Sequence, residues 1–162
     1  MGHSELLLTL GAIAIFGMVL LTTNRKMIEQ NDNMIQREFE YYAISAAQTF
    51  IEEAKTKWFD ENVILASPDS SGFTSYSTLG PEGETYANFN DVDDYHGYSA
   101  AVIDTTAHGS FFVNITVGYV SETDPETQLT GEAYYKKMTV TITNRYLDAP
   151  VSMSYVFGYL QN

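Results

Sequence analysis

The sequence predicts an α+β protein in which a long N-terminal α-helix packs on a C-terminal antiparallel β-sheet of about four strands. Three patterns predict this class. Residues 6–24 are strongly apolar and carry no charge, residues 25–59 repeat apolar side chains with a helical period, and residues 98–162 alternate apolar and polar side chains as strands do. No proline occurs before position 68, so nothing forces the first two segments apart.

Length and charge limit the classes of function. A chain of 162 residues accommodates one globular domain and an extension. The net charge of −13 is uneven, because residues 1–59 hold five basic and seven acidic residues and residues 60–162 hold three and fourteen. The second part is therefore an acidic body that nucleic acid and anionic lipid repel, and no nucleic-acid partner is expected. With no cysteine, the chain has no disulfide, thiolate zinc site or cysteine nucleophile.

Residues 1–24 are interpreted as an apolar helix of a membrane or of a filament core. The uncharged run from Leu6 to Thr23 is just long enough to cross a bilayer, which takes about 20 helical residues. A secretory signal peptide has basic residues before such a run and a small-residue cleavage site after it, and neither is present. Instead Glu5 precedes the run. A carboxylate at that depth is costly without a partner, so Glu5 is the first candidate functional residue.

Residues 25–59 are predicted to continue the helix in amphipathic form. One face carries apolar side chains at intervals of three, four or seven, namely Ile28, Ile35, Phe39, Tyr42, Ala46, Phe50 and Ala54. A continuous helix from Glu5 to Phe59 would be about 80 Å long, more than a globular domain needs. Weak helix formers between positions 11 and 33 favour a bend or local unwinding there.

The remainder is expected to form a connection and a sheet. Residues 60–97 are rich in Ser, Gly, Asp, Asn and Pro and read as an acidic connecting loop, long enough to suggest a binding edge. In the globular head, residues 98–162, strands are expected at 98–104, 110–120, 134–146 and 151–160. The helical stripe at 39–58 is available to cover one face of this sheet. The first half of the helix then needs lipid or other copies of the chain to cover it.

One cluster suggests a metal, and nothing suggests an enzyme. Asp91, Asp93 and Asp94 offer the oxygen ligands that calcium takes, although their spacing is not that of an EF-hand. The alternative is an acidic turn whose carboxylates cap local backbone amides. Calcium is thus the one cofactor considered. Because the sequence contains no nucleophile elbow, P-loop or dinucleotide-binding motif, no catalytic activity is expected.

Together these features resemble a mature type IV pilin or pilin-like subunit. The residues that carry the resemblance are Met1, Glu5 and the run Leu6–Leu21, followed by the amphipathic continuation and the terminal sheet. The match is specific in the N-terminal helix and architectural elsewhere. Two departures stand out: residues 2–4 are small or polar where the family has Thr-Leu-Ile, and the C-terminal disulfide loop of many pilins is missing.

The resemblance implies a structural subunit of an extracellular filament with roles such as adhesion or motility. The precursor would lie in the inner membrane, lose a basic leader to a prepilin peptidase, become N-methylated at Met1 and meet a pilus assembly platform. Copies would then polymerise with Glu5 paired to the N-terminal amine of a neighbour. The implied filament-core residues are Leu6, Leu7, Leu8, Leu10, Ile13, Ile15, Phe16, Met18, Val19, Leu20 and Leu21.

Two alternatives remain beside the filament subunit. The first is a pseudopilin or minor pilin of a secretion or pilus machine. The second is a monomeric, membrane-anchored extracytoplasmic binding module whose loop at 66–97 recognises a ligand. If Met1 is the initiator methionine, no leader was removed, and the implied processing and methylation do not apply.

Overall fold

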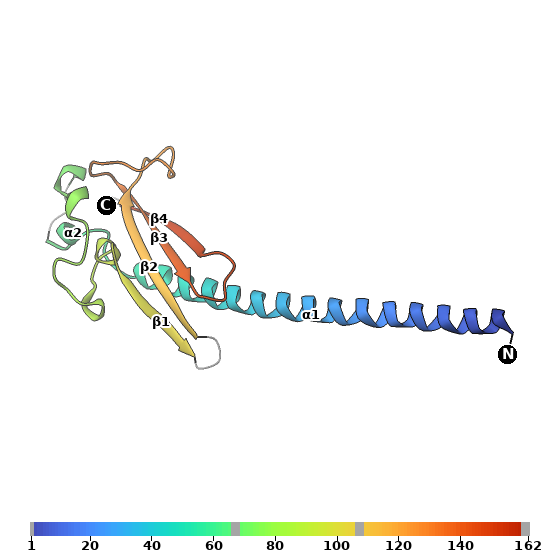
Figure 1. Cartoon of the computed structure of the whole chain (residues 1–162). Coiled ribbons are helices and arrows are strands. Elements are labelled where there is room, and N and C mark those ends of the chain that lie inside the picture. The colour runs from blue at the N-terminus through green and yellow to red at the C-terminus, as the bar shows by residue number, and fades with distance from the viewer. Residues whose placement is uncertain (1, 66–68, 106–108, 160–162) are drawn as a thin grey trace. The chain divides into compact units, whose positions relative to one another are not determined.

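The computed structural model describes residues 2–65, 69–105 and 109–159 and confirms the predicted α+β fold. A long helix, α1 (His3–Ala54), packs against a four-stranded antiparallel sheet (Figure 1). A short helix, α2 (Glu61–Leu65), follows it. The strands are β1 (Ser99–Thr105), β2 (Gly109–Tyr119), β3 (Tyr135–Thr143) and β4 (Val151–Gly158).

Helix α1 is a single element of 52 residues. Every residue between 11 and 33 is helical, so the unwinding that weak helix formers favoured there does not occur. The helix ends at Ala54 rather than at residue 59. The next turn tightens, because the Thr56 and Lys57 amides donate to carbonyls three residues back, at 3.0 Å each. Trp58 then forms a parallel bridge with Asp91.

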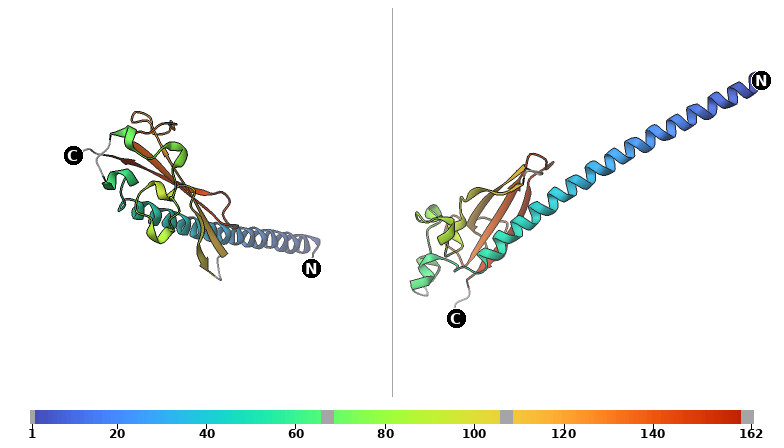
Figure 2. Two further views of the ribbon diagram at one scale, coloured as in Figure 1. Left: turned by 90° about the vertical axis from the view of Figure 1, so that its left-hand side faces the viewer. Right: turned by 90° about the horizontal axis from the view of Figure 1, so that it is seen from below.

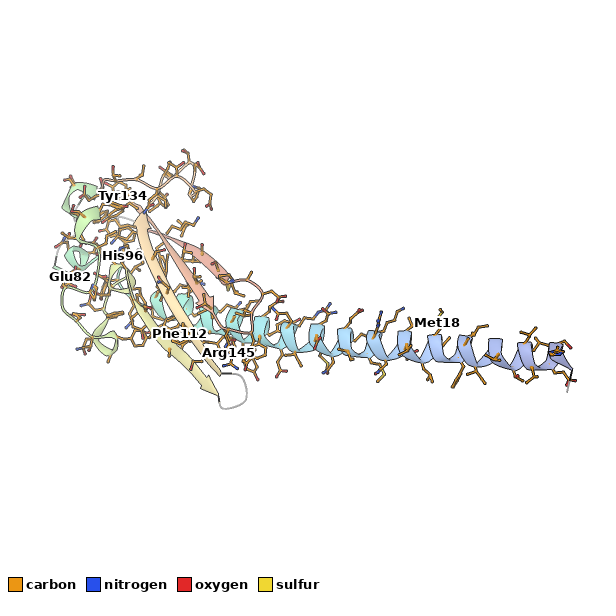
Figure 3. The ribbon with its side chains drawn as sticks, viewed as in Figure 1. Met18, Glu82, His96, Phe112, Tyr134 and Arg145 are labelled. Carbon is orange, nitrogen blue, oxygen red and sulfur yellow. The ribbon has the colours of Figure 1, made fainter. Side chains whose placement is uncertain are left out.

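The chain divides into two compact units, Met1–Glu38 and Phe39–Asn162, which are described in turn. In the first unit the side chains are exposed on all sides of the helix, as Figure 3 shows around Met18. The exposed fractions of its large apolar residues between Leu6 and Leu21 range from 49 % for Leu6 to 75 % for Leu8. An α-helix that is apolar around its whole circumference is one that other molecules normally surround.

The second unit is built on the sheet, whose strands follow one another in the order β1-β2-β3-β4. Each neighbouring pair is antiparallel, as short connections require. Successive residues face opposite sides, so Val113, Ile115 and Val117 are buried while Asn114 and Thr116 are exposed. A register shift between Ala101 and Ile103 marks a bulge in the edge strand β1.

Residues 39–54 of α1 cover one face of this sheet (Figure 2). The covering side of the helix carries alanines between two phenylalanines, and small side chains let the helix lie close to the strands. The buried helical residues are Phe39, Ala43, Ala46, Ala47, Phe50, Ile51 and Ala54. They pack against the inward side chains of β2 and β3, which places the main core between the C-terminal half of α1 and the sheet.

The segment expected as a connecting loop is more ordered than its composition indicated. Besides α2 it contains four short 3-10 turns at 70–72, 76–78, 86–88 and 93–95. Its aromatic and aliphatic side chains supply buried area. Phe73 and Leu79 join Phe59 and Tyr119 in a second cluster, and Phe89 and Tyr95 join the main core. Polar composition predicted the absence of long elements correctly but missed the packing of the residues between them.

Candidate functional site

Glu5 caps the helix on which it stands. Its carboxylate Oε2 accepts a hydrogen bond from the Gly2 backbone N–H at 3.2 Å, while the amides of Glu5 and Leu6 donate to the Gly2 carbonyl at 3.0 and 3.3 Å. A glutamate that reaches back three residues to the first amide is one half of a capping box, and its charge also suits the positive end of the helix dipole. Glu5 therefore has a local role that the sequence analysis did not identify.

The partner expected for Glu5 belongs to a second copy of the chain, so that pairing stays a prediction. Met1, the expected methylation site, lies outside the described residues. The eleven predicted filament-core residues, from Leu6 to Leu21, are all exposed on α1. The structure thus places Glu5 at the head of a continuous apolar surface.

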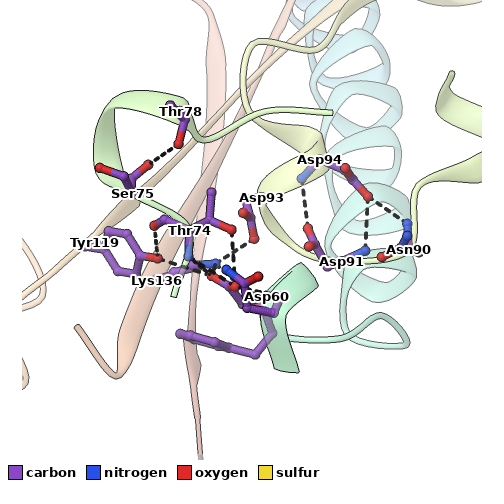
Figure 4. Close-up of polar contacts among 12 residues, drawn as sticks. Asp60, Thr74, Ser75, Thr78, Asn90, Asp91, Asp93, Asp94, Tyr119 and Lys136 are labelled. Carbon is purple, nitrogen blue, oxygen red and sulfur yellow. Dashed lines mark hydrogen bonds and ion pairs between the residues drawn. The ribbon is translucent and has the colours of Figure 1, made fainter. Parts of the chain in front are cut away.

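A buried lysine forms a densely bonded polar site in the second unit (Figure 4). Lys136 lies on the inward face of β3 and is fully buried. Its ammonium group donates to Asp60 Oδ2 at 2.7 Å, Asp93 Oδ1 at 2.6 Å and the Phe59 carbonyl at 2.9 Å. All three N–H groups therefore have acceptors. The side chain joins the sheet to two segments 43 and 76 residues away in sequence.

Asp60 is held by four other donor groups besides Lys136. The backbone amides of Asn62 and Thr74, the Thr74 hydroxyl and the Tyr119 hydroxyl all contact its carboxylate. Burial alone would raise the pKa of Asp60, but the charge and hydrogen bond of Lys136, with the two amides, outweigh burial and lower it. Asp60 is consequently ionised and forms a true ion pair with Lys136.

The three predicted calcium ligands, Asp91, Asp93 and Asp94, are buried, and their carboxylates have different partners. Asp94 Oδ2 accepts the amides of Asn90 and Asp91 at 2.7 and 3.1 Å, and Asp91 Oδ1 accepts the Asp94 amide at 3.1 Å. Asp93 instead pairs with Lys136. These contacts are those of the alternative considered from the sequence, an acidic turn that caps its own backbone.

A calcium ion at this turn would compete with partners that are already present. It would compete with Lys136 at Asp93 Oδ1 and with a backbone amide at Asp94 Oδ2. Within the described ranges, no three His, Cys, Asp or Glu side chains are arranged to hold a metal ion. Calcium binding here stays a prediction.

Carboxylates outnumber lysines around this turn. The pKa values of two of them, Asp91 and Glu82, are therefore raised, which favours their protonated forms. Burial, followed by the charge of Asp93, raises the pKa of Asp91 to about 9, so Asp91 is neutral at pH 7. Partial desolvation and then the charges of Asp93 and Asp94 raise the pKa of Glu82 to about 7. The turn is therefore sensitive to alkaline conditions.

Replacing Asp91 by asparagine is expected to reduce the loss of stability that the protein shows as the pH rises from 6 to 8. The unfolded carboxyl titrates near 3.8 and the folded one near 9, so between these values only the folded state keeps the proton. In that window each pH unit lowers the free energy of unfolding by up to about 1.4 kcal/mol. Asparagine resembles the protonated acid and does not titrate. Urea titrations at several pH values measure the slope, and an unchanged slope in Asp91→Asn would contradict the assignment.

A second carboxylate ties α1 to the following segment. Glu53 accepts hydrogen bonds from the hydroxyl groups of Tyr86 and Tyr95, the latter at 2.9 Å. Burial and then the bond to Glu53 raise the pKa of both tyrosines, which keeps both hydroxyls protonated as donors. The last turn of the helix is thereby anchored to the turn that carries Asp91–Asp94.

The sequence analysis missed Lys136, Asp60 and Glu53. A signal for the first of them was available. Lys136 has the same parity along its strand as Met138, Val140 and Ile142, so the alternation places it on the buried face. A lysine at a core position needs anionic partners. Their identity depends on contacts between distant segments, which the alternation of one strand does not contain.

Comparison of the chain with models of known protein families, with curated proteins and with solved structures finds no match. A functional argument therefore depends on the residues themselves. Two features are available for it: the exposed apolar half of α1 with Glu5 at its head, and the polar surfaces of the second unit.

Proposed function

We propose that the chain is a structural subunit of an extracellular, type IV pilus-like filament, in which the N-terminal helices of many copies bundle in the core. The observation that carries the proposal is the unbroken apolar surface of α1. All eleven large apolar residues from Leu6 to Leu21 are about half to three-quarters exposed. The role is structural rather than catalytic, with other copies of the chain as the principal partner.

The size of this surface is what demands a partner. Burying a large apolar side chain is worth about 1.5–3 kcal/mol, so eleven of them at these exposures correspond to roughly 10–20 kcal/mol. A solitary chain in water would therefore aggregate. Lipid or a bundle of identical helices removes the cost.

Residues beyond the membrane-length segment favour helices as the final partner. Arg25 and Lys26 end the uncharged run, yet large apolar side chains continue to be exposed after them. These are Met27 at 64 %, Ile28 at 56 %, Met34 at 65 % and Ile35 at 43 %. Because polar residues alternate with them, they form a stripe that suits contact with another helix rather than immersion in hydrocarbon.

Before assembly the same helix would hold the precursor in the inner membrane. Among the described residues, α1 is the helix long and apolar enough to span a bilayer, and its apolar segment is not buried. N-terminal signal sequences meet the same criteria. The proposal adds the pilin route: prepilin peptidase, methylation of Met1, the assembly platform and release into an extracellular filament.

Glu5 would set the register between subunits. A carboxylate buried without a partner costs several kcal/mol, and the N-terminal amine of a neighbour would offset that cost. Positions along the bundle that leave Glu5 unpaired would then be excluded. The hydrogen bond from Gly2 is compatible with this role, since one carboxylate oxygen can serve the helix while the group retains its charge.

Electron microscopy of material sheared from the surface of its native cells tests the proposal. The acidic segment 122–132 is exposed at most of its positions, so an antibody against it can decorate intact filaments. We expect regular labelling along the filaments and this chain as a component of them by mass spectrometry. Label confined to short stubs at the membrane would favour the pseudopilin alternative. A chain that is found solely as a detergent-extracted monomer would contradict assembly and favour the anchored binding module.

A further inference from the structure

The face of the sheet that α1 leaves uncovered carries mainly short polar side chains on its three longest strands. Its outward positions carry short hydroxyl and amide side chains in aligned rows. One row crosses all four strands and consists of Ser99, Asn114, Thr141 and Ser152, which are register partners. The next row contains Thr116, Thr139 and Ser154.

These hydroxyls are held in fixed positions. Thr141 Oγ1 lies 3.0 Å from Ser152 Oγ, and Thr139 Oγ1 lies 3.0 Å from Ser154 Oγ, so hydrogen bonds link the side chains across β3 and β4. The rows are about 6.7 Å apart along a strand, and members of one row are about 4.8 Å apart. Short, linked side chains lose little rotamer entropy when a ligand covers them.

Charge is the second distinguishing property. The chain has a net charge of −13, yet among the outward side chains that the structure describes on the strands, Lys137 is the single charged one. That lysine stands at one end of the face, where it pairs with Glu126 at 2.6 Å. The surface therefore suits a ligand that is uncharged and rich in groups that both donate and accept hydrogen bonds.

A groove and an aromatic ring lie at opposite ends of this face. The groove, about 330 Å³, is lined by Thr116, Gly118, Lys137 and Thr139 from the strands and by His96, Glu126 and Gln128 from the flanking segments. A volume of that size is at the lower end for small-ligand sites. At the other end Phe112, on the exposed face of β2, is 53 % exposed (labelled in Figure 3). From Phe112 to Gly118 is about 20 Å along the strand, the length of a short oligosaccharide.

Gly118 lets the Gln128 side chain lie directly against the strand. A Cβ atom at this position would lie 2.7 Å from Gln128 Nε2, so any larger residue would push the Gln128 amide off the strand. The His96 ring is oriented by its Nδ1 atom, which accepts the Val117 amide at 3.1 Å. Amide, imidazole and hydroxyl groups, together with the ion pair between Lys137 and Glu126, thus line one small site that continues directly into the hydroxyl rows through Thr116 and Thr139.

We propose that this outward face binds a chain of uncharged sugars, with one residue in the groove and the following ones along the hydroxyl rows toward Phe112. Sugar hydroxyls both donate and accept, as serine and threonine do, and the apolar face of a sugar ring stacks on an exposed aromatic ring. The acidic remainder of the domain disfavours anionic polysaccharides. Binding does not require assembly, but repetition of the face along a filament would add avidity.

Retention of the detergent-solubilised full chain on insoluble polysaccharides tests the proposal. The probes are amorphous cellulose, chitin and insoluble starch, with cross-linked polygalacturonate as the anionic comparison. We expect retention on at least one neutral probe and none on polygalacturonate. Thr141→Lys, which places a charge in the middle of the rows, and Phe112→Ser should each weaken retention at least fivefold.

Ser77→Lys is the matched control, because it adds the same charge at an exposed site away from the strands. It should bind as the unaltered chain does. Thermal unfolding of each variant establishes whether the globular head is folded. If Thr141→Lys does not fold, Phe112→Ser alone carries the test. The proposal is overturned if no neutral probe retains the chain, if polygalacturonate retains it equally, or if Ser77→Lys weakens binding as much as the two face variants.

Discussion

Replacing Glu5 by glutamine is expected to lower the yield of sheared filaments at least tenfold, although the helix keeps its cap. Glutamine serves in a capping box as glutamate does, so the hydrogen bond from the Gly2 amide can persist. The negative charge is lost. If Glu5 neutralises the N-terminal amine of a neighbour, the variant leaves that amine buried and unpaired, at a cost of about 3–5 kcal/mol. Quantitative immunoblotting of sheared and cell-bound fractions measures the effect.

Two comparisons separate the charge of Glu5 from its capping role. Glu5→Ala loses both the charge and the cap, and Glu29→Gln removes a charge from an exposed position further along α1. We expect Glu5→Gln and Glu5→Ala to be equally defective and Glu29→Gln to assemble normally. Normal filament yield from Glu5→Gln with a defect in Glu5→Ala would show that capping is the function of this residue, and would refute the register role.

Replacing Lys136 by methionine is expected to lower the free energy of unfolding by about 3–5 kcal/mol, the cost of leaving buried charges without their counter-ion. Asp60 and Asp93 would then both remain buried after losing their ion pairs with Lys136. The second unit would lose the link between β3 and the segments at 60 and 93. Urea unfolding of the full chain in detergent, followed by the fluorescence of Trp58, measures the change.

The neighbouring lysine provides the control for this prediction. Lys137 stands one residue further along β3 on the outward face, where its ion pair with Glu126 is exposed to solvent. Exposed pairs contribute about 0–1 kcal/mol, so Lys137→Met should be nearly neutral. Adding Asp60→Asn and Asp93→Asn to Lys136→Met should restore part of the lost stability. Equal effects of the two lysine variants would contradict the buried ion cluster.

The fold was predictable because its elements follow from local periodicity. The alternation of Met138, Val140 and Ile142 with threonines located β3, which begins one residue after and ends three residues before the expected range 134–146, and the short connections indicated an antiparallel sheet. The helix followed from the absence of proline and the apolar stripe. Its end did not, because the tight turn after Ala54 is followed by a bridge between Trp58 and Asp91, a contact with a distant segment that no local pattern indicates.

A candidate site could be predicted from the sequence where its residues lie in one segment. It could not be predicted where residues of distant segments come together. Glu5 stands out because it is a lone charge beside an apolar run. The ion cluster of Lys136 joins positions 60, 93 and 136, and no spacing within any one segment relates them. The three aspartates at 91–94 were recognised as a group, but their partners, a lysine and their own backbone, became apparent only in the folded chain.

Photo-cross-linking within sheared filaments tests the central claim, that copies of the chain cover the apolar half of α1. Benzoylphenylalanine in place of Phe16 lies in the middle of the exposed run, and the same substitution at Phe112 lies on the outward face of the sheet. Filament assembly predicts a ladder of products at multiples of 18.1 kDa from position 16 and none from position 112. Cross-links from position 16 to lipid or detergent alone, with no product between chains, would contradict it.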